Sequence, residues 1–205
     1  MRALLDHFQI SEAIFIGWSF GGQVLMEGYR TFSERFKGMV LLNALVGPAT
    51  DGLPLKEILR PVFRWMTGFW RPAWSLLSPI ASRAVSSEAF LMGAKHLGIV
   101  GKSLNEHIFE EIAVEFIRMD HQVFQKILHA SQQYDGFPVL PTITFPVLVI
   151  SGTRDFIVLP SLTRSIAGFI PDPSLVMLPG TSHYSALEAP EEVVEEIENY
   201  LEQYG

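Results

Sequence analysis

Cysteine is absent from this chain of 205 residues. Without thiols the protein can form neither a disulfide framework nor a thiolate metal site, and nothing in the sequence indicates an oxidising compartment, so we expect a cytoplasmic protein. Histidine and acidic residues show no regular metal-ligand spacing either. The sequence therefore implies no metal and no cofactor.

Basic residues are scarce, at 15 lysines and arginines against 22 acidic residues, which gives a formal net charge of -7. No basic cluster is present that would follow a phosphate backbone, so we expect no nucleic-acid partner. Long apolar runs are also missing: none approaches the roughly 20 residues that cross a bilayer, so we expect no membrane span. Residues 1–8 form a short amphipathic pattern, in which we expect no targeting segment.

Apolar residues nevertheless make up 48% of the chain, enough for one domain with a substantial core. Short apolar runs without polar alternation are typical of parallel strands that are buried on both faces. Four such runs occur, at residues 13–17, 38–43, 145–150 and 175–178. We therefore predict an α/β fold built on a parallel sheet.

Helical patterns separate these runs. Residues 21–31 connect the first two runs as a βαβ unit, and residues 161–169 lie between the last two. The final helix begins at Pro190, where the missing N–H costs nothing. Its buried face is expected to carry Val193, Ile197 and Leu201. The glutamates on its other faces are expected to form a solvated surface.

Residues 47–141 interrupt this alternation with helical patterns and no convincing strand. We interpret them as an inserted helical lid on a core formed by residues 1–46 and 142–205. The predicted lid helices cover residues 53–60, 62–77, 88–97, 104–119 and 121–134. The second of these carries an aromatic cluster of Trp65, Phe69, Trp70 and Trp74. Such a cluster can pack the lid onto the core, line an acyl pocket or contact a membrane interface, and we favour packing.

Residues 17–21, Gly-Trp-Ser-Phe-Gly, lie between the first predicted strand and the helix that follows it. A strand-turn-helix this tight holds its central residue in strained backbone geometry and lifts the hydroxyl clear of the sheet, which makes Ser19 a candidate nucleophile. We expect side chains at Gly17 and Gly21 to collide with the neighbouring strand or helix. The Phe20 amide starts the helix and can point at an oxyanion.

A serine hydroxyl is a weak nucleophile at neutral pH, so it needs a base and a further group that orients the base. Asp155 lies in the loop after the third predicted strand, and His183 lies in the loop after the fourth. Loops at the carboxyl ends of parallel strands converge on one edge of a sheet, where Ser19 also lies. We therefore expect these three side chains to meet.

With these residues in the order serine, aspartate, histidine, the chain resembles the serine-dependent α/β-hydrolase family from Ile10 to its C-terminus. The resemblance implies Ser19 as nucleophile, His183 as general base and Asp155 as the residue that orients the base. It also implies that the Phe20 N–H is an oxyanion donor. Branches with a carboxylate nucleophile, the dehalogenases and epoxide hydrolases, fit poorly. The candidate pocket residues are Trp18, Phe20, Trp65, Phe69 and Tyr184.

Each of these assignments has a competing interpretation. A Gly-x-Ser-x-Gly pattern arises by chance, and a serine at a helix start is commonly a cap. The rival carboxylates are Asp51, Asp120 and Asp135, none of which follows a predicted strand. The other histidines, at positions 7, 96, 107, 121 and 129, lie on helical patterns. Among them His121, beside Asp120, is best placed to touch a substrate, but we expect it, like the others, to be a surface or lid residue.

Two stretches match nucleotide-binding loops superficially. Residues 17–22 resemble a dinucleotide loop, but the strand after them ends in Asn43 and not in the acidic residue that would hold a ribose. Residues 101–103, Gly-Lys-Ser, match the end of a P-loop, but His96 stands where the earlier glycine is required and no strand precedes it. Both interpretations fail on context.

Members of the family normally carry, ahead of the elbow, several more strands and a His-Gly loop that supplies a second oxyanion donor. No such segment precedes residues 13–17, so we expect that strand to present an unpaired apolar edge. Losing one oxyanion donor typically costs about 10²–10³ in turnover. We expect that the sequence is an incomplete version of a longer hydrolase, with a homodimer or a partner chain that covers the edge as the other possibility.

The function that we expect is hydrolysis of a carboxylic ester, or of a related acyl or C–C bond, through an acyl-enzyme. The aromatic lid suggests a hydrophobic small molecule as substrate. Esterase, lactonase, thioesterase, perhydrolase and C–C hydrolase chemistry all stay open, because no motif reports the specificity of such lids. The alternative is a catalytically impaired fragment or pseudoenzyme that acts as a binding module.

Overall fold

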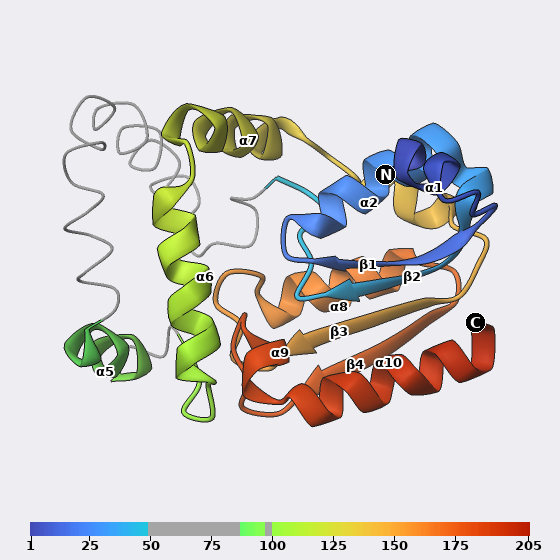
Figure 1. Ribbon diagram of the computed structural model, residues 1–205. Helices are drawn as coiled ribbons and strands as arrows, with labels where there is room; N and C mark the ends of the chain where they lie inside the picture. The colour runs from blue at the N-terminus through green and yellow to red at the C-terminus, as the bar shows by residue number, and fades with distance from the viewer. Residues whose placement is uncertain (49–86, 97–99) are drawn as a thin grey trace.

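The computed structural model describes residues 1–48, 87–96 and 100–205. Its core is a four-stranded sheet in the order β1-β2-β3-β4, in which every neighbouring pair of strands is parallel (Figure 1). The strands are β1 (Ala13–Trp18), β2 (Phe36–Leu42), β3 (Val147–Gly152) and β4 (Pro173–Leu178). The four predicted strands and their parallel arrangement are confirmed.

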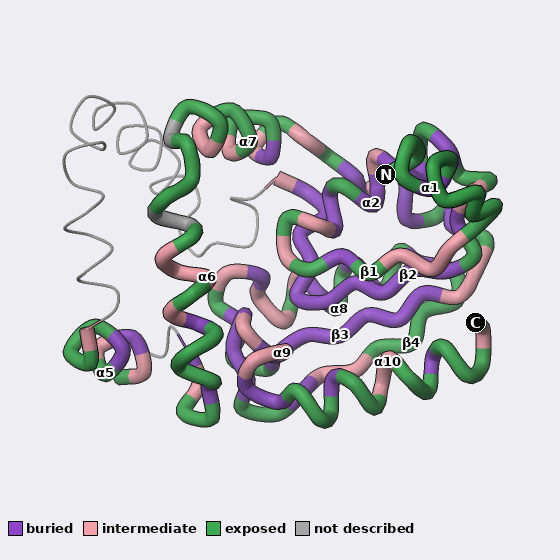
Figure 2. Tube along the Cα trace, viewed as in Figure 1, coloured by how far each residue is buried: buried purple, intermediate pink, exposed green. Residues whose placement is uncertain are grey.

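The two central strands form the most buried part of the sheet. Every residue of β3 is buried, and β2 is exposed only at Lys37 (Figure 2). Their continuous apolar sequences fit strands that are covered on both faces. β1 lies at the edge: among the described residues it pairs with β2 alone, and Ile16 is 51% exposed. This is the exposed apolar edge that the sequence predicted.

Helices cover both faces of the sheet (Figure 1). On one face lie α2 (Gly21–Phe32) and α8 (Pro160–Phe169), and on the other lies α10 (Pro190–Tyr204). The larger apolar cluster, on the first face, includes Met26, Leu41, Val149 and Ile166. The smaller cluster, under α10, includes Val40, Ile150, Val193 and Tyr200. The helices predicted after the first, third and fourth strands are thereby confirmed.

The buried face of α10 differs from the prediction at one position. Val193 is buried and Ile197 packs on the same cluster, but Leu201 is 40% exposed, so its predicted burial was wrong. Tyr200 takes its place. Seven residues make almost two full turns, so Tyr200 returns to the direction of Val193, whereas Leu201 has turned about 80° away.

The described part of residues 47–141 is helical and contains no strand. Its elements are α5 (Glu88–His96), α6 (Glu106–Arg118), α7 (His121–Gln133) and η2 (Phe137–Thr142). The helices predicted at 88–97, 104–119 and 121–134 are confirmed, and those predicted at 53–60 and 62–77 lie outside the described residues. Figure 1 places α6 beyond the carboxyl ends of the strands.

Three short elements complete the described chain: α1 (Arg2–His7), η1 (Ser33–Arg35) and α9 (Ser185–Glu188). α9 follows β4 and lies beside the N-terminal end of α6 (Figure 1), where the Asn105 N–H donates to the Leu187 carbonyl at 3.1 Å. None of the described helices is long and apolar enough to cross a membrane.

The Tyr200 hydroxyl ties α10 to β2 and to the residue before β3, because it accepts from the Met39 N–H at 3.1 Å and donates to the Pro146 carbonyl at 2.5 Å. Tyr200→Phe leaves both groups without this partner, so we expect the free energy of unfolding to fall by about 1–3 kcal/mol in urea titrations. Tyr204→Phe, on the same helix, is the matched control. Equal losses in the two variants would contradict this role of the hydroxyl.

Candidate active site

Ser19 occupies the turn between β1 and α2 with a φ of +53°. For a residue with a side chain this left-handed conformation costs about 1–3 kcal/mol, so the predicted strained turn is confirmed. A Cβ on Gly17 would lie 2.7 Å from Leu25 Cδ1, as expected. The collision expected at Gly21 was wrong, because that position faces open space. Gly22 is the crowded position, where a Cβ would overlap the backbone that follows β2.

The structure brings Ser19, Asp155 and His183 together at the carboxyl edge of the sheet, where they follow β1, β3 and β4. His183 Nε2 lies 2.8 Å from Ser19 Oγ, and His183 Nδ1 lies 2.9 Å from Asp155 Oδ2. Asp155 is 1% exposed and His183 is 4% exposed, whereas Ser19 is half-buried. The hydrogen bonds therefore run from a buried carboxylate to a hydroxyl that solvent can reach.

Asp155 is fixed by four hydrogen bonds to its two oxygens. Oδ1 accepts from the amides of Ile157 and Val158 at 2.9 and 2.8 Å. Oδ2 accepts from His183 Nδ1 and from Asn43 Nδ2, each at 2.9 Å. An ionised carboxylate only accepts, so we assign the imidazole proton to Nδ1. Nε2 is then the acceptor that faces Ser19, as a general base requires.

Asn43 is a site residue that sequence reasoning missed. It follows β2 with a φ of +45°, a conformation that asparagine tolerates better than most residues. Its Nδ2 also donates to the Ser182 carbonyl at 3.2 Å, and its Oδ1 accepts from Ser185 Oγ. Asn43 thus joins the Asp155 loop to the His183 loop. A polar residue at the carboxyl end of a buried strand is the signal that could have indicated it.

The rival residues have other partners. Asp120 accepts from two amides in the first turn of α7, and Asp135 accepts from the amide two residues further on. His107 and His129 contact side chains four residues along their own helices. Neither rival carboxylate that the structure describes therefore orients an imidazole. Asp51, Trp65, Phe69 and the side chain of His121 lie outside the described residues.

Two of the predicted pocket aromatics flank His183. Trp18 Nε1 donates to the His183 carbonyl at 3.2 Å, and the two ring centroids lie 5.8 Å apart. The Tyr184 ring packs edge-on against Phe109 of α6, with centroids 5.1 Å apart. Burial raises the pKa of Tyr184, so its hydroxyl stays neutral. These aromatic rings thus hold the histidine loop between β1 and α6.

Phe20, the third described pocket candidate, lines a hollow of about 260 Å³ between α2 and α7. The other lining residues are Gln23, Val24, Glu27, Ala130, Ser131 and Tyr134. Burial and the Glu27 carboxylate raise the pKa of Tyr134 to about 12, so that hydroxyl also stays neutral. The hollow begins at the residue next to Ser19, and apolar and aromatic side chains form much of its wall.

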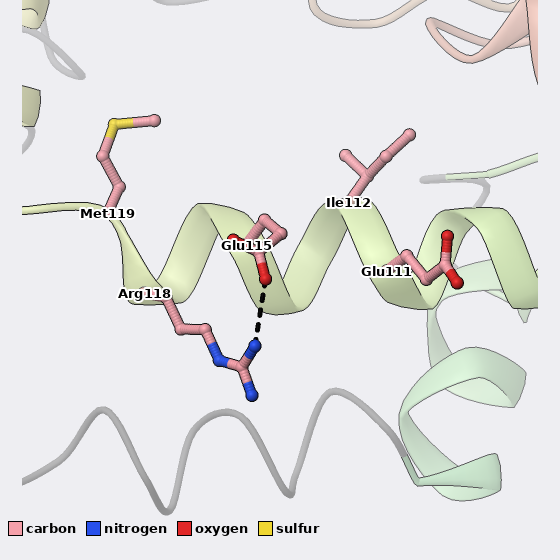
Figure 3. Close-up of a pocket in the computed structure, with 5 residues that line it drawn as sticks. All are labelled: Glu111, Ile112, Glu115, Arg118 and Met119. Carbon is pink, nitrogen blue, oxygen red and sulfur yellow. Dashed lines mark hydrogen bonds and ion pairs between the residues drawn. The ribbon is translucent and has the colours of Figure 1, made fainter.

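A larger hollow of about 580 Å³ runs along α6 (Figure 3). Figure 3 shows Ile112 and Met119 pointing away from Glu115 and Arg118, which form an ion pair at 3.0 Å. Glu111 completes the described lining. Neither the elbow nor the histidine loop contributes a residue to the described lining, so this hollow lies apart from Ser19 and His183.

Comparisons with known proteins agree with this architecture. A family model described as "Alpha/beta hydrolase family" matches residues 1–196. A relative, 3-oxoadipate enol-lactonase 2 of Acinetobacter baylyi, is 25% identical over an alignment of 208 residues. The alignment covers 99% of this chain and 68% of the relative.

Solved structures show the same fold. A thermophilic esterase from Thermogutta terrifontis matches with 22% identity and a TM-score of 0.65, over 98% of this chain and 69% of the esterase. A bromoperoxidase from Bacillus anthracis matches with 14% identity and a TM-score of 0.74, over 98% of this chain and 71% of that protein. The chain therefore belongs to the alpha/beta hydrolase family and is a hydrolytic enzyme of that family.

Proposed function

We propose that Ser19, His183 and Asp155 form a catalytic triad that cleaves a carboxylic ester or a related acyl bond through an acyl-enzyme. The observation that carries this proposal is the 2.8 Å contact between His183 Nε2 and Ser19 Oγ. An imidazole that is hydrogen-bonded to a serine on one side and to a carboxylate on the other is the arrangement that activates a serine nucleophile.

In the acylation step, the Ser19 oxygen attacks the substrate carbonyl while its proton passes to His183 Nε2. The imidazolium that forms is stabilised by Asp155, which keeps the ring oriented through Nδ1. His183 then gives the proton to the departing alkoxide as the carbonyl–oxygen bond of the ester breaks. The acyl group is left on Ser19, and the alcohol is released.

The Phe20 N–H supports oxyanion stabilisation in this scheme. It lies at the N-terminal end of α2, where helix amides lack intrahelical acceptors and the helix dipole favours negative charge. Among the described residues no hydrogen bond uses this N–H, so it is free to donate to the carbonyl oxygen as negative charge develops.

Deacylation repeats these two steps with water as the nucleophile. His183 Nε2 takes a proton from the water that attacks the acyl carbonyl, and then returns the proton to Ser19 as the acyl–serine bond breaks. The products are a carboxylic acid and free enzyme. The half-buried position of Ser19 supports this step, because water must reach it.

For the substrate we propose a small ester or lactone with an apolar group. The enol-lactonase relative and the esterase of the same fold are named for these bonds, and a lactone is an ester closed into a ring. The hollow that begins at Phe20 is lined by Val24, Ala130 and the ring of Tyr134, which suits an apolar chain.

Ser19→Ala removes the proposed nucleophile, so we expect p-nitrophenyl acetate hydrolysis to fall by at least about 10⁴-fold. Ser165→Ala, at an exposed serine of α8, is the control and keeps the wild-type rate. A Ser19→Ala variant that hydrolyses the ester as fast as the wild type would contradict the proposal. Ligand binding without Ser19-dependent hydrolysis would favour a binding module.

The pH dependence of kcat/KM tests whether His183 acts as the general base. Only neutral imidazole accepts the Ser19 proton, so kcat/KM should rise as the pH rises from 5. Initial rates are measured between pH 5 and 8, with circular dichroism to check that the fold persists. A flat profile over this range would count against His183 as base.

Filling the α2–α7 hollow should shorten the acyl chain that the protein accepts. In Ala130→Phe the new ring occupies the hollow, so we expect kcat/KM for p-nitrophenyl octanoate to fall about tenfold or more, with the acetate ester little affected. Val123→Phe, at a 49% exposed position on α7, is the control. Equal losses for both esters would remove this hollow from the substrate site.

A further inference from the structure

Glu188 is a buried carboxylate that the proposed reaction does not use. It ends α9, it is 5% exposed, and both of its oxygens are hydrogen-bonded. Oε2 accepts from the Ser182 N–H at 2.7 Å, and Oε1 accepts from Ser182 Oγ at 2.5 Å. Oε1 also accepts from the Gly101 N–H at 2.6 Å. Two amides and a hydroxyl that point at one carboxylate match the acceptor-only character of an ionised glutamate.

Two of these bonds fix the residue that precedes His183. Ser182 is held on its amide and hydroxyl by Glu188, and on its carbonyl by Asn43 Nδ2 at 3.2 Å. The Tyr184 N–H donates to Ser182 Oγ at 3.3 Å, which closes the turn around the histidine. Asp155 and Glu188 both bond to this turn, and burial together with their charges raises the pKa of Tyr184.

The third bond reaches a separate part of the chain. Gly101 lies between α5 and α6, 87 residues before Glu188. The same contact is supported by an apolar cluster in which Tyr184 and Leu187 pack against buried residues of the α5–α6 segment. Those residues are Leu91, Ala94, Val100, Leu104 and Phe109. Glu188 thus bonds Gly101, which precedes α6, to the loop that carries His183.

The close approach of the Gly101 backbone to Glu188 depends on the absence of a side chain at position 101. A Cβ added there would overlap the Glu188 carboxylate, whereas a Cβ added at Gly93, on α5, meets nothing within 4 Å. The Glu188 side chain is buried and bonded on both oxygens, so it has little room to move aside. The two glycines therefore form a matched pair, one under the carboxylate and one away from it.

We propose that Glu188 is a positioning residue that holds the His183 imidazole in line with Ser19, and that the α5–α6 segment acts on catalysis through it. This inference rests on the proposed triad. The 2.8 Å contact from His183 to Ser19 has a tolerance of a few tenths of an ångström, and a misplacement of about 1 Å can cost about 10²-fold in rate. The carboxylate reaches the reacting atoms only through the backbone of residues 182–183.

In Glu188→Gln one carboxylate oxygen becomes an NH₂ group. This group cannot accept from an N–H, so part of the hydrogen bonding to Ser182 and Gly101 is lost. We expect kcat for p-nitrophenyl acetate to fall about 10²-fold, with KM changed less than about threefold, because the substrate does not touch this group. Gly101→Ala retains the Glu188 side chain but pushes its carboxylate aside, and should lower kcat about tenfold. Gly93→Ala should keep the wild-type kcat. Circular dichroism and thermal melting show which variants fold, and if Glu188→Gln does not fold, Gly101→Ala decides the question.

A second readout separates this inference from the proposed function. The His183 Nδ1 proton, bonded to Asp155, should give a far-downfield proton resonance that moves or broadens in Glu188→Gln and Gly101→Ala but not in Gly93→Ala. If the variants give that response but the wild type hydrolyses no ester, the proposed function is wrong and the positioning contact stands. If the wild type is active and both variants keep its kcat and its resonance, the positioning role is overturned. A rise in KM alone would overturn it as well.

Discussion

The buried Asp155 carboxylate is the group on which the rest of the site depends. A charge removed from water is costly unless its oxygens are hydrogen-bonded, and here four donors meet it. Two of them are amides of its own loop, so Asp155 is oriented before it meets His183. Asp155 in turn orients the His183 imidazole, and the imidazole bonds to Ser19.

The parallel sheet supplies the convergence that this arrangement needs. Strand ends that lie side by side bring residues from four distant segments to one edge, and Asn43 and Glu188 then bond the loops to one another. The strained φ of Ser19 has the same origin, because a tight turn at a strand end is what turns the hydroxyl toward the histidine. Strain, burial and hydrogen bonding are therefore concentrated where we place the chemistry.

The features that could be predicted from the sequence have local signals. Continuous apolar runs identify the strands, Pro190 identifies a helix start, and the elbow glycines identify the turn at Ser19. Asp155 and His183 follow from their places just after strands. The spatial meeting of these residues was an inference from parallel topology, and the structure brings them within hydrogen-bonding distance.

The features that could not be predicted depend on contacts between distant residues. Asn43 bonds to a carboxylate 112 residues away, and nothing near Asn43 in the chain indicates that partner. Gly101 looked like part of a failed P-loop, yet its lack of a side chain is explained by Glu188. Tyr200 lies on the buried face in place of Leu201, and its hydroxyl bonds to β2 and to the residue before β3, contacts that hydrophobic periodicity does not record.

The central claim is our proposal that the burial and bonding of Asp155 and His183 make Ser19 a reactive serine. Fluorophosphonate labelling followed by peptide mass mapping tests it most directly, since the reagent bonds covalently to an activated serine oxygen. The account predicts a single adduct, located on Ser19. No adduct, or an adduct on another serine, would contradict it.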